Sequence, residues 1–335
     1  MSNAEYESKA YFAMSLDPIH IGTGGYRLGR VDNTIVRESG TNLPKIPGSS
    51  IEGNARTYAY YREVGNKDSK FKIPEESCAL GKELNNNKPC GICPVCVSFG
   101  YTGAERTKLV NNGKGGEERI SESLHGMAQF SDARILFFPV HSMIGPVWVT
   151  CPSFLKEVYE EKVEPRRKEE LVISKQIGEN HELKKLNLGW LYLDLDREEN
   201  SPDFTNSSQF KDKFNINDEI LERVVVVHDD IFEKIVNSNL EVRTSVSIDP
   251  RTGAAEEGAL FTYEAIPRAT ILWFNVVFNQ PENFNAKLME KGQLRKAKGD
   301  DVERTIKNSF ELFETLGIGG MQTRGFGRLR ILNGG

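Results

Sequence analysis

The order in which apolar strands and helices follow one another constrains the fold of this chain more than any single motif. YFAMSL at residues 11–16, RVVVVH at 223–228 and ATILWFNVVF at 269–278 predict strands, the last of them buried. With the helices described below, the order is strand, helix, insertion, strands, helix, hairpin, strand, helix, strand. This order predicts an α+β fold of ferredoxin type, built as one domain over residues 1–335 with large insertions.

The predicted helices are identified by apolar residues at helical spacing and by polar residues that can cap their first turns. A helix is expected from Ile51, a second over DDIFEKIV at 229–236, and an amphipathic third that ends near Leu316. The residues expected to cap them are Ser49 or Ser50, Asp229 or Asp230, and Asp300 or Asp301. Residues 153–170 are also expected to be helical, whereas residues 177–218 are expected to be polar and irregular.

Two segments are expected to lie outside the ferredoxin-like core. A long β-hairpin is predicted at residues 240–266, because apolar and polar side chains alternate from Val242 to Ile248 and DPRTG is a turn signal. The stretch at residues 65–120 is rich in Gly, Asn and Lys and is predicted to be a polar insertion.

Composition excludes several classes of protein. Apolar residues make up 38% of the chain, which is enough for a packed core, but no window of 18 apolar residues predicts a membrane span. The first residues are acidic and lack the apolar stretch of a secretory signal, so a cytoplasmic location is expected. The net charge is −5, whereas free-standing nucleic-acid binders are usually basic, so RNA binding would need a local basic patch.

Four of the five cysteines lie within nineteen residues of the polar insertion. Cys78, Cys90, Cys93 and Cys96 have the spacing C-x11-C-x2-C-x2-C, which favours a structural, tetrahedral zinc site. Iron–sulfur proteins also use C-x2-C-x2-C, and unliganded thiols are the third possibility. A metal would fold a segment that has little apolar content of its own. Cys151 is isolated and is expected to pack in the core.

Two glycine-rich loops, at residues 19–39 and 317–328, could approach a phosphate closely. Neither has the sequence of a Walker or dinucleotide-binding loop, and a solvated turn is the alternative in each case. Arginines in the second loop and the start of the helix near residue 49 suit an extended phosphate backbone better than one nucleotide. The candidate RNA-binding residues are Lys45, Ser49, Ser50, Arg56, Gly319, Gly320, Gln322, Arg324 and Arg328.

Four stretches, in this order, resemble the RAMP superfamily (repeat-associated mysterious proteins): HIGTG, VDNTIVRESGTNLPKIPGSSIEGNAR, FSDARILFFPVHS with WVTCP, and GIGGMQTRGFGRLRIL. Within it the chain is most similar to the backbone subunit of the type III-B CRISPR effector, the Cmr complex. The resemblance implies a modified RNA-recognition-motif fold with a palm, a finger-like insertion at residues 65–120 and a β-hairpin thumb at residues 240–266. Glu52 stands where the family more often has a basic residue.

The resemblance also implies a function. Copies of the chain would stack along a guide RNA (crRNA) as a filament, together with other effector subunits. A target RNA that pairs with the guide would be cut once per copy, at regular intervals, in a reaction that needs Mg²⁺ or Mn²⁺. In the family an aspartate in the loop after the first strand is essential for this cut, and the matching residue here is Asp32. The thumb would separate base pairs, and the segments around residues 45–56 and 317–328 would hold the guide backbone.

Three further residues are candidates for catalysis beside Asp32. His20 stands near the same loop and could act as a general acid, with a structural histidine as the alternative. Glu257 and Tyr263 lie on the far arm of the hairpin and could approach the cut site from there. Tyr263 could equally be a packing aromatic, Asp32 a turn residue, and the neighbouring Glu264 either a site residue or a solvated charge.

The residues and the resemblance together favour a metal-dependent endoribonuclease that acts within an RNA-guided assembly, with no membrane partner. A backbone subunit that binds guide RNA without cutting is one alternative. A guide-precursor-processing endoribonuclease of the same superfamily is another, and it would cut precursor RNA without the other subunits.

Overall fold

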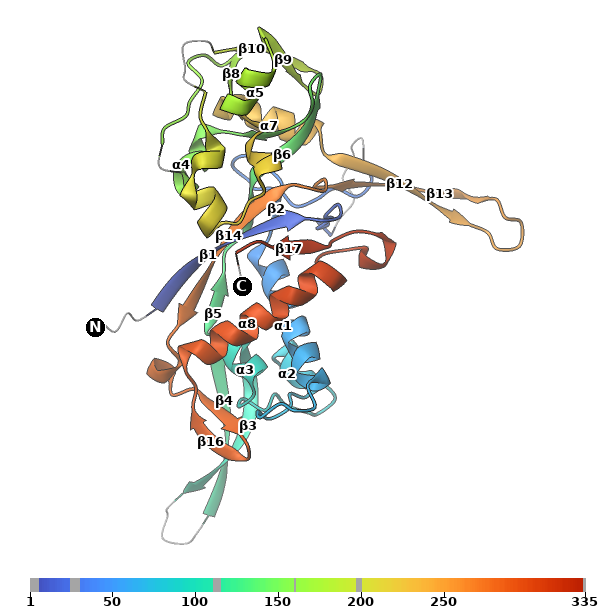
Figure 1. Ribbon diagram of the computed structural model, residues 1–335. Coiled ribbons are helices and arrows are strands. Elements are labelled where there is room, and N and C mark those ends of the chain that lie inside the picture. Colours follow the sequence, from blue (N-terminus) through green and yellow to red (C-terminus); the bar gives the residue numbers. More distant parts are fainter. Residues whose placement is uncertain (1–5, 25–30, 111–115, 160, 197–200, 334–335) are drawn as a thin grey trace.

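Four antiparallel strands give this chain a ferredoxin-like centre, as the computed structural model in Figure 1 shows. They lie in the order β17-β1-β14-β6, with the bounds Leu329–Ile331, Tyr6–Ser15, Ile271–Asn279 and Ala133–Ser142. In chain order this is fourth, first, third, second, with a helix after the first strand and after the third, which confirms the predicted α+β fold class. The structure describes residues 6–24, 31–110, 116–159, 161–196 and 201–333, with the side chains of all but residues 104–110, 116–121, 212 and 257–259.

Two helices, α1 (Gly48–Gly65) and α8 (Gly299–Leu316), cover one face of these strands (Figure 1). Tyr11 of β1 stacks on Phe274 of β14, with ring centroids 5.7 Å apart, and meets Phe310 of α8 edge-on at 5.1 Å. Aromatic pairs of this kind stabilise a core beyond the apolar area that they bury. The apolar face predicted for α8 is confirmed except at its last residue, which is exposed where the helix ends.

The opposite face of the four strands is covered as well. Phe12 of β1 is fully buried against Phe214, with ring centroids 3.7 Å apart. Trp273 of β14 is 5% exposed, and the Arg134 guanidinium carbon lies 4.4 Å from its ring centre. RNA-recognition motifs bind bases on the aromatic side chains of an open sheet face. The aromatic side chains of Phe12 and Trp273 are buried and so do not form such an open platform.

Beyond β6 the sheet continues into a second half that does not belong to the ferredoxin-like unit, seen above it in Figure 1. The order is β6-β7-β11-β8-β10-β9, and the added strands span Gly145–Thr150, Val224–Val227, Glu170–Ile173, Leu191–Leu195 and Lys185–Leu188. Its helices are α4 (Pro152–Val158), α5 (Lys175–Asn180), α6 (Asp218–Leu221), α7 (Asp229–Ser238), η1 (Phe204–Asn206) and η2 (Gln209–Lys213).

Two predictions for this second half are wrong. The helix predicted for residues 153–170 ends at Val158, because Tyr159 and Val163 turn inward and are buried, and Pro165 cannot continue a helix. The region at 177–218, predicted to be irregular, contains β9, β10 and single-turn helices. Its apolar residues alternate only over four or five positions, which is too short for the periodicity to be recognised.

Three excursions leave the sheet. The insertion after α1 holds α2 (Glu76–Leu80), α3 (Pro94–Phe99) and a hairpin of β3 (Gly100–Val110) and β4 (Gly116–His125). Between β14 and α8 lie η3 (Pro281–Phe284), β15 (Lys287–Glu290) and β16 (Gln293–Lys296). The predicted hairpin is present as β12 (Glu241–Ile248) and β13 (Ala255–Ala265), and it projects from the body (Figure 1). The remaining elements are β2 (Lys45–Ile46), β5 (Ala128–Phe130) and η4 (Gln322–Arg324).

None of the helices in the described ranges is both long and apolar enough to cross a membrane. The N-cap residues are Pro47 for α1, His228 for α7 and Lys298 for α8, each one to three residues before the residues predicted to cap. The capping predictions are therefore wrong in position, although Asp301 does accept the Lys298 N–H at 3.0 Å in the first turn of α8.

At α1 the capping acceptor comes from a distant part of the chain. Asp132 Oδ1 accepts the Gly48 N–H at 2.8 Å, and Asp132 Oδ2 lies 2.5 Å from Lys45 Nζ. A local sequence pattern cannot reveal an acceptor that is 84 residues away from its donor. This is why Ser49 and Ser50, rather than Asp132, were expected to satisfy the first turn.

We predict that Asp132→Ala lowers the free energy of unfolding by about 1 to 2 kcal/mol, because the first N–H of α1 loses its acceptor. Ser49→Ala should change it by less than about 0.5 kcal/mol, since Ser49 is exposed and makes no capping bond. Urea unfolding followed by circular dichroism measures both variants. Equal losses in the two would contradict the assignment of Asp132 as the cap.

Candidate functional site

The first glycine-rich loop meets a distant part of the chain at the base of the β12–β13 hairpin. The start of this loop pairs with its later segment, residues 31–37, through an antiparallel bridge between Gly22 and Ile35. That segment pairs in turn with the end of β13, through a parallel bridge between Asn33 and Tyr263. Asp32 is therefore carried on a strand-like segment that is fixed on both sides by backbone pairing.

The Asp32 side chain is exposed, and Thr262 of β13 holds it in place. Asp32 Oδ2 accepts two hydrogen bonds, from Thr262 Oγ1 at 2.7 Å and from the Thr262 N–H at 2.9 Å. The Asp32 N–H donates to Thr262 Oγ1 at 2.9 Å. The hydrogen bond from the Thr262 hydroxyl and, to a smaller extent, the one from the Thr262 N–H lower the pKa of Asp32. The side chain is therefore a carboxylate at neutral pH. Both of these bonds are to Oδ2, and no other described residue donates to Oδ1.

A buried ion pair holds the same segment farther along. Glu264 Oε1 lies 2.6 Å from Arg37 Nη2, and the two side chains are 11% and 15% exposed. Glu264 Oε2 also accepts the Ile35 N–H at 3.2 Å, and Arg37 Nη1 donates to the Ile35 carbonyl at 3.1 Å. The sequence allowed Glu264 to be either a site residue or a solvated charge. Its burial shows that the solvated charge is wrong. Glu264 is a buried residue that fastens the Asp32 segment to β13.

His20 is 7% exposed and lies against the end of β13. Its Nδ1 is 2.6 Å from the Glu264 carbonyl oxygen. A carbonyl can only accept, so we assign the ring proton to Nδ1, and Nε2 of the neutral ring is then an acceptor. Nε2 is therefore the ring nitrogen through which His20 could exchange a proton, and the general-acid and structural roles expected from the sequence both fit this contact. Among the described residues, no hydrogen bond joins His20 to Asp32.

Tyr263 contacts His20 on one side and Arg324 on the other. The Tyr263 and His20 rings meet edge-on with centroids 5.9 Å apart, and Arg324 Nη1 donates to Tyr263 Oη at 3.4 Å. Side chains alternate along a strand, so Tyr263 lies on the opposite face of β13 from the threonine that binds Asp32. The backbone of Glu257 belongs to β13, but its side chain lies outside the described residues.

The C-terminal glycine loop packs closely against the first glycine-rich loop. The Gly320 N–H donates to the His20 carbonyl at 2.9 Å. Gly319 has a φ of +83°, and a Cβ added there would lie 2.7 Å from the same carbonyl oxygen and would overlap the Ile21 side chain. Of these two predicted RNA-binding glycines, Gly319 is therefore needed for the contact between the two protein segments, whereas Gly320 contributes only its backbone N–H.

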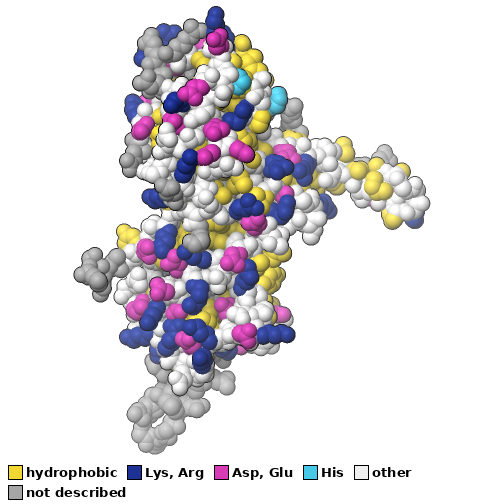
Figure 2. Space-filling model, viewed as in Figure 1, with side chains coloured by type: hydrophobic (Ala, Val, Ile, Leu, Met, Phe, Trp, Pro, Cys, Tyr) yellow, Lys and Arg dark blue, Asp and Glu magenta, His cyan; other side chains and the backbone are white. Residues whose placement is uncertain are grey.

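Arginines gather around this junction, where Figure 2 shows basic side chains at the point at which the hairpin leaves the body. The group consists of Arg243, Arg268, Arg324 and Arg328. Arg328 holds Asp17 through two bonds, of 2.5 Å and 3.0 Å, and lowers the pKa of Asp17, with smaller contributions from Arg243 and Arg268. Arg268 and Arg324 are exposed and form no ion pair with a described residue. Two exposed arginines without a carboxylate partner among the described residues thus lie beside the hairpin base of an acidic chain.

Arg56, also predicted to bind RNA, is engaged within the protein. Its guanidinium is 12% exposed and donates to the carbonyls of Cys78 at 2.9 Å, Phe99 at 3.1 Å and Gly100 at 2.6 Å. Arg56 therefore fastens the cysteine-bearing insertion to α1.

The other predicted RNA-binding residues differ in how much of each side chain is available. Lys45 is paired with Asp132, and Gln322 Nε2 donates to a backbone carbonyl at 3.1 Å. Ser49 and Ser50 lie in the first turn of α1, and Ser49 is exposed. The sequence reasoning missed Thr262, Arg37 and Arg268, and only the position of Thr262 beside the candidate Tyr263 could have drawn attention to it.

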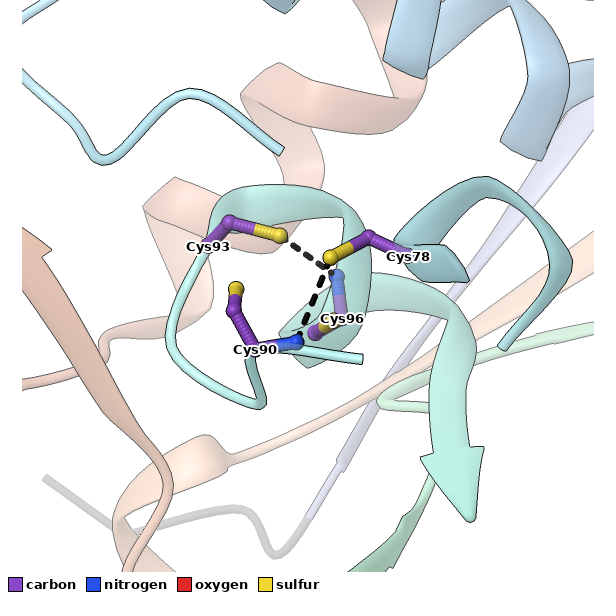
Figure 3. A group of neighbouring side chains, drawn as sticks. All are labelled: Cys78, Cys90, Cys93 and Cys96. Atoms are coloured by element: carbon purple, nitrogen blue, oxygen red, sulfur yellow. Dashed lines mark hydrogen bonds between the residues drawn. The ribbon is translucent and has the colours of Figure 1, made fainter. Parts of the chain in front are cut away.

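The four clustered cysteines converge as the spacing predicted (Figure 3). The four sulfurs lie within 4.8 Å of one another. Cys78 belongs to α2, Cys93 and Cys96 lie at the start of α3, and Cys90 lies between these two helices. Backbone N–H groups support two of the sulfurs, from Cys90 to Cys78 Sγ at 3.3 Å and from Cys96 to Cys93 Sγ at 3.4 Å. Hydrogen bonds from the other three cysteines lower the pKa of Cys78, and Cys90 contributes most. Burial raises the pKa of Cys93.

This arrangement fits a metal ion such as zinc. Four thiolates at such short separations repel one another unless a cation lies between them, and a tetrahedral ion provides that charge. The cluster is also the one group of three or more His, Cys, Asp and Glu ligand atoms found close enough to hold an ion in the described part of the chain. Cys151, the fifth cysteine, is 2% exposed and packed in the core, as predicted.

We predict that Arg37→Met lowers the free energy of unfolding by about 3 kcal/mol, because it leaves the Glu264 carboxylate buried without its partner. Arg251→Met is the matched control. The Arg251 side chain is 88% exposed, so its ion pair with Asp249 should contribute less than about 0.5 kcal/mol to the free energy of unfolding. Chemical denaturation of both variants tests this. A small effect of Arg37→Met, no larger than the control, would show that the pair does not fasten the segment.

Known proteins resemble this chain in sequence and fold. A family profile described as the RAMP superfamily matches residues 14–330. The CRISPR system Cmr endoribonuclease Cmr4 of Pyrococcus furiosus is 25% identical over 342 residues, which cover 96% of this chain and 95% of the relative.

Solved structures show the same fold. The oligomeric Cmr4 crystal structure from Pyrococcus furiosus has a TM-score of 0.56 and 18% identity, over 98% of this chain and 99% of that chain. A chain of the type III-B Cmr-beta complex bound to cognate target RNA has a TM-score of 0.56 and 16% identity, over 98% and 99%. With the profile covering nearly its whole length and the fold in agreement, the chain belongs to the RAMP superfamily.

Proposed function

We propose that this chain is the backbone subunit of a type III-B CRISPR effector and that it cuts target RNA beside Asp32. The observation that carries the proposal is the Asp32 carboxylate, exposed and held rigidly at the base of a projecting hairpin. The likeness to the Cmr4 endoribonuclease and to a Cmr complex bound to target RNA supports it. The partners are then guide RNA, target RNA, further copies of this chain and the other effector subunits.

The arginine group at the hairpin base supports the RNA-binding part of the proposal. Arg268 and Arg324 are exposed and have no carboxylate partner among the described residues, so they can bind phosphates without breaking an ion pair. Arg243 is partly held by Glu241, at 2.6 Å, and lies over the Phe326 ring. Arginine bound to phosphates explains how a chain of net charge −5 can bind a polyanion on one face.

The hairpin itself suits the separation of stacked bases. Apolar side chains on it are unusually exposed, as the yellow atoms along the projection in Figure 2 show. They are Val242, Val246, Ile248, Leu260 and Phe261, of which Leu260 is 62% exposed. Proteins that distort nucleic acids insert apolar side chains of this kind between base steps. The thumb role expected from the resemblance is therefore part of the proposal.

The chemistry that Asp32 can perform follows from its environment. In the proposed cut, the 2′-oxygen of a target nucleotide bonds to the adjacent phosphorus and loses its proton, while the bond from phosphorus to the 5′-oxygen breaks and that oxygen gains a proton. The products are a 2′,3′-cyclic phosphate and a 5′-hydroxyl. A carboxylate whose pKa is lowered by Thr262 is a weak proton acceptor, so Asp32 is better suited to orient the reacting groups.

A divalent cation would fit Asp32 only in part. Asp32 offers one carboxylate oxygen, and no described cluster adds further protein ligands there, so phosphate oxygens and waters would complete the shell of Mg²⁺ or Mn²⁺. Such an ion, when bound, stabilises negative charge on the phosphate. His20 and Tyr263 lie on the other face of β13, where His20 Nε2 could accept a proton and Tyr263 could donate a hydrogen bond to RNA.

We predict that Asp32→Asn abolishes cleavage of paired target RNA by the complex assembled with guide RNA, while target binding is retained, because the amide keeps the shape but not the charge. Asp68→Asn, a change at another exposed aspartate, is the matched control and should cut at the rate of the unaltered complex. Cleavage is followed on labelled target RNA, and binding by gel shift. Full cleavage by the Asp32→Asn complex would favour a backbone role without catalysis.

We also propose that the cysteine cluster binds one structural zinc ion. Cys96→Ser should lose the zinc and lower the melting temperature, because the ion would link α2 to the start of α3. Cys151→Ser removes the one cysteine outside the cluster and should keep the zinc. Elemental analysis of both purified variants decides this, and iron with sulfide in place of zinc would contradict the proposal.

A further inference from the structure

Thr262 bonds to Asp32 in a way that is unusual for an exposed carboxylate. Its hydroxyl and its N–H both donate to Asp32 Oδ2, at 2.7 Å and 2.9 Å, and the same hydroxyl oxygen accepts the Asp32 N–H at 2.9 Å. These three bonds form a closed ring between residues that are 230 positions apart. One oxygen of Asp32 is thereby saturated by protein, and the other has no partner among the described residues.

An exposed aspartate without such bonds would exchange between side-chain rotamers. It would then lack the precise alignment that cleavage needs. We propose that Thr262 is a positioning residue that fixes the orientation of the Asp32 carboxylate and directs its Oδ1 toward the bound RNA. This inference rests on the proposed function, because it assigns Thr262 to the reaction at Asp32. It also ties the cutting residue to the hairpin, since Thr262 is part of β13.

The backbone pairing around Thr262 does not depend on its hydroxyl. The Asn33 N–H donates to the Thr262 carbonyl at 3.0 Å, and the Glu264 N–H donates to the Asn33 carbonyl at 3.0 Å. The Thr262 N–H bond to Asp32 is likewise a backbone donor. Removing the hydroxyl should therefore leave the segment in place and change only the constraint on the carboxylate.

The chain provides a matched control on the neighbouring strand. Thr244 of β12 is directly opposite Thr262 in the antiparallel pair. It is exposed, and it forms no hydrogen bond with Asp32. Thr244→Val and Thr262→Val make the same chemical change at paired positions of one hairpin, because valine keeps the branched shape and strand preference of threonine without the hydroxyl.

The test uses complexes assembled with guide RNA from Thr262→Val, Thr262→Ser and Thr244→Val chains. Single-turnover cleavage should slow roughly 10- to 100-fold in Thr262→Val, with target affinity and melting temperature within error of the unaltered complex. Thr262→Ser keeps the hydroxyl and should recover the rate to within about threefold. Thr244→Val should cut at the unaltered rate.

Three results would overturn the inference: an unaltered rate in Thr262→Val, equal slowing in Thr262→Val and Thr244→Val, or no recovery in Thr262→Ser. An Asp32→Asn complex assayed in parallel distinguishes failure of the inference about Thr262 from failure of the proposed function. If Asp32→Asn is inactive and Thr262→Val is not slowed, the role of Thr262 alone is wrong. If Asp32→Asn still cuts, the proposed function fails first and the inference fails with it.

Discussion

Three successive residues of β13 organise the candidate site, and the rest of the arrangement depends on them. Thr262 and Glu264 point to one face, where they hold the Asp32 side chain and, through Arg37, the segment that carries it. Tyr263 points to the other face, where it meets His20 and the C-terminal loop. The alternation of side chains along a strand thus allows one strand to position two sets of groups.

The ferredoxin-like unit serves as a scaffold whose two sheet faces are already occupied. Helices α1 and α8 cover one face, and Phe12 and Trp273 are buried on the other. Exposed charged and apolar side chains are therefore found on the hairpin and on the loops at its base. The exposed arginines and Asp32 lie at the hairpin base and the exposed apolar side chains along the hairpin, although the chain as a whole is acidic.

The sequence predicted those features that rest on local patterns. The α+β fold class, the hairpin, the apolar face of α8 and the convergence of four cysteines were recoverable, because periodicity, turn residues and ligand spacing are local signals. Contacts between distant residues were not recoverable. Asp132 caps α1, Thr262 holds Asp32, and Arg56 binds carbonyls of the insertion, and in each case the partner could be identified only in three dimensions.

Mapping the products of a guide-paired target RNA cut by the assembled complex shows most directly whether Asp32 orients the RNA for cleavage. If one fixed Asp32 per copy orients the RNA for attack by its own 2′-oxygen, cuts will fall at regular intervals, and each fragment will end in a 2′,3′-cyclic phosphate with a 5′-hydroxyl on the next fragment. Cuts at irregular positions, or fragments that carry 5′-phosphates, would show that Asp32 does not act in this way.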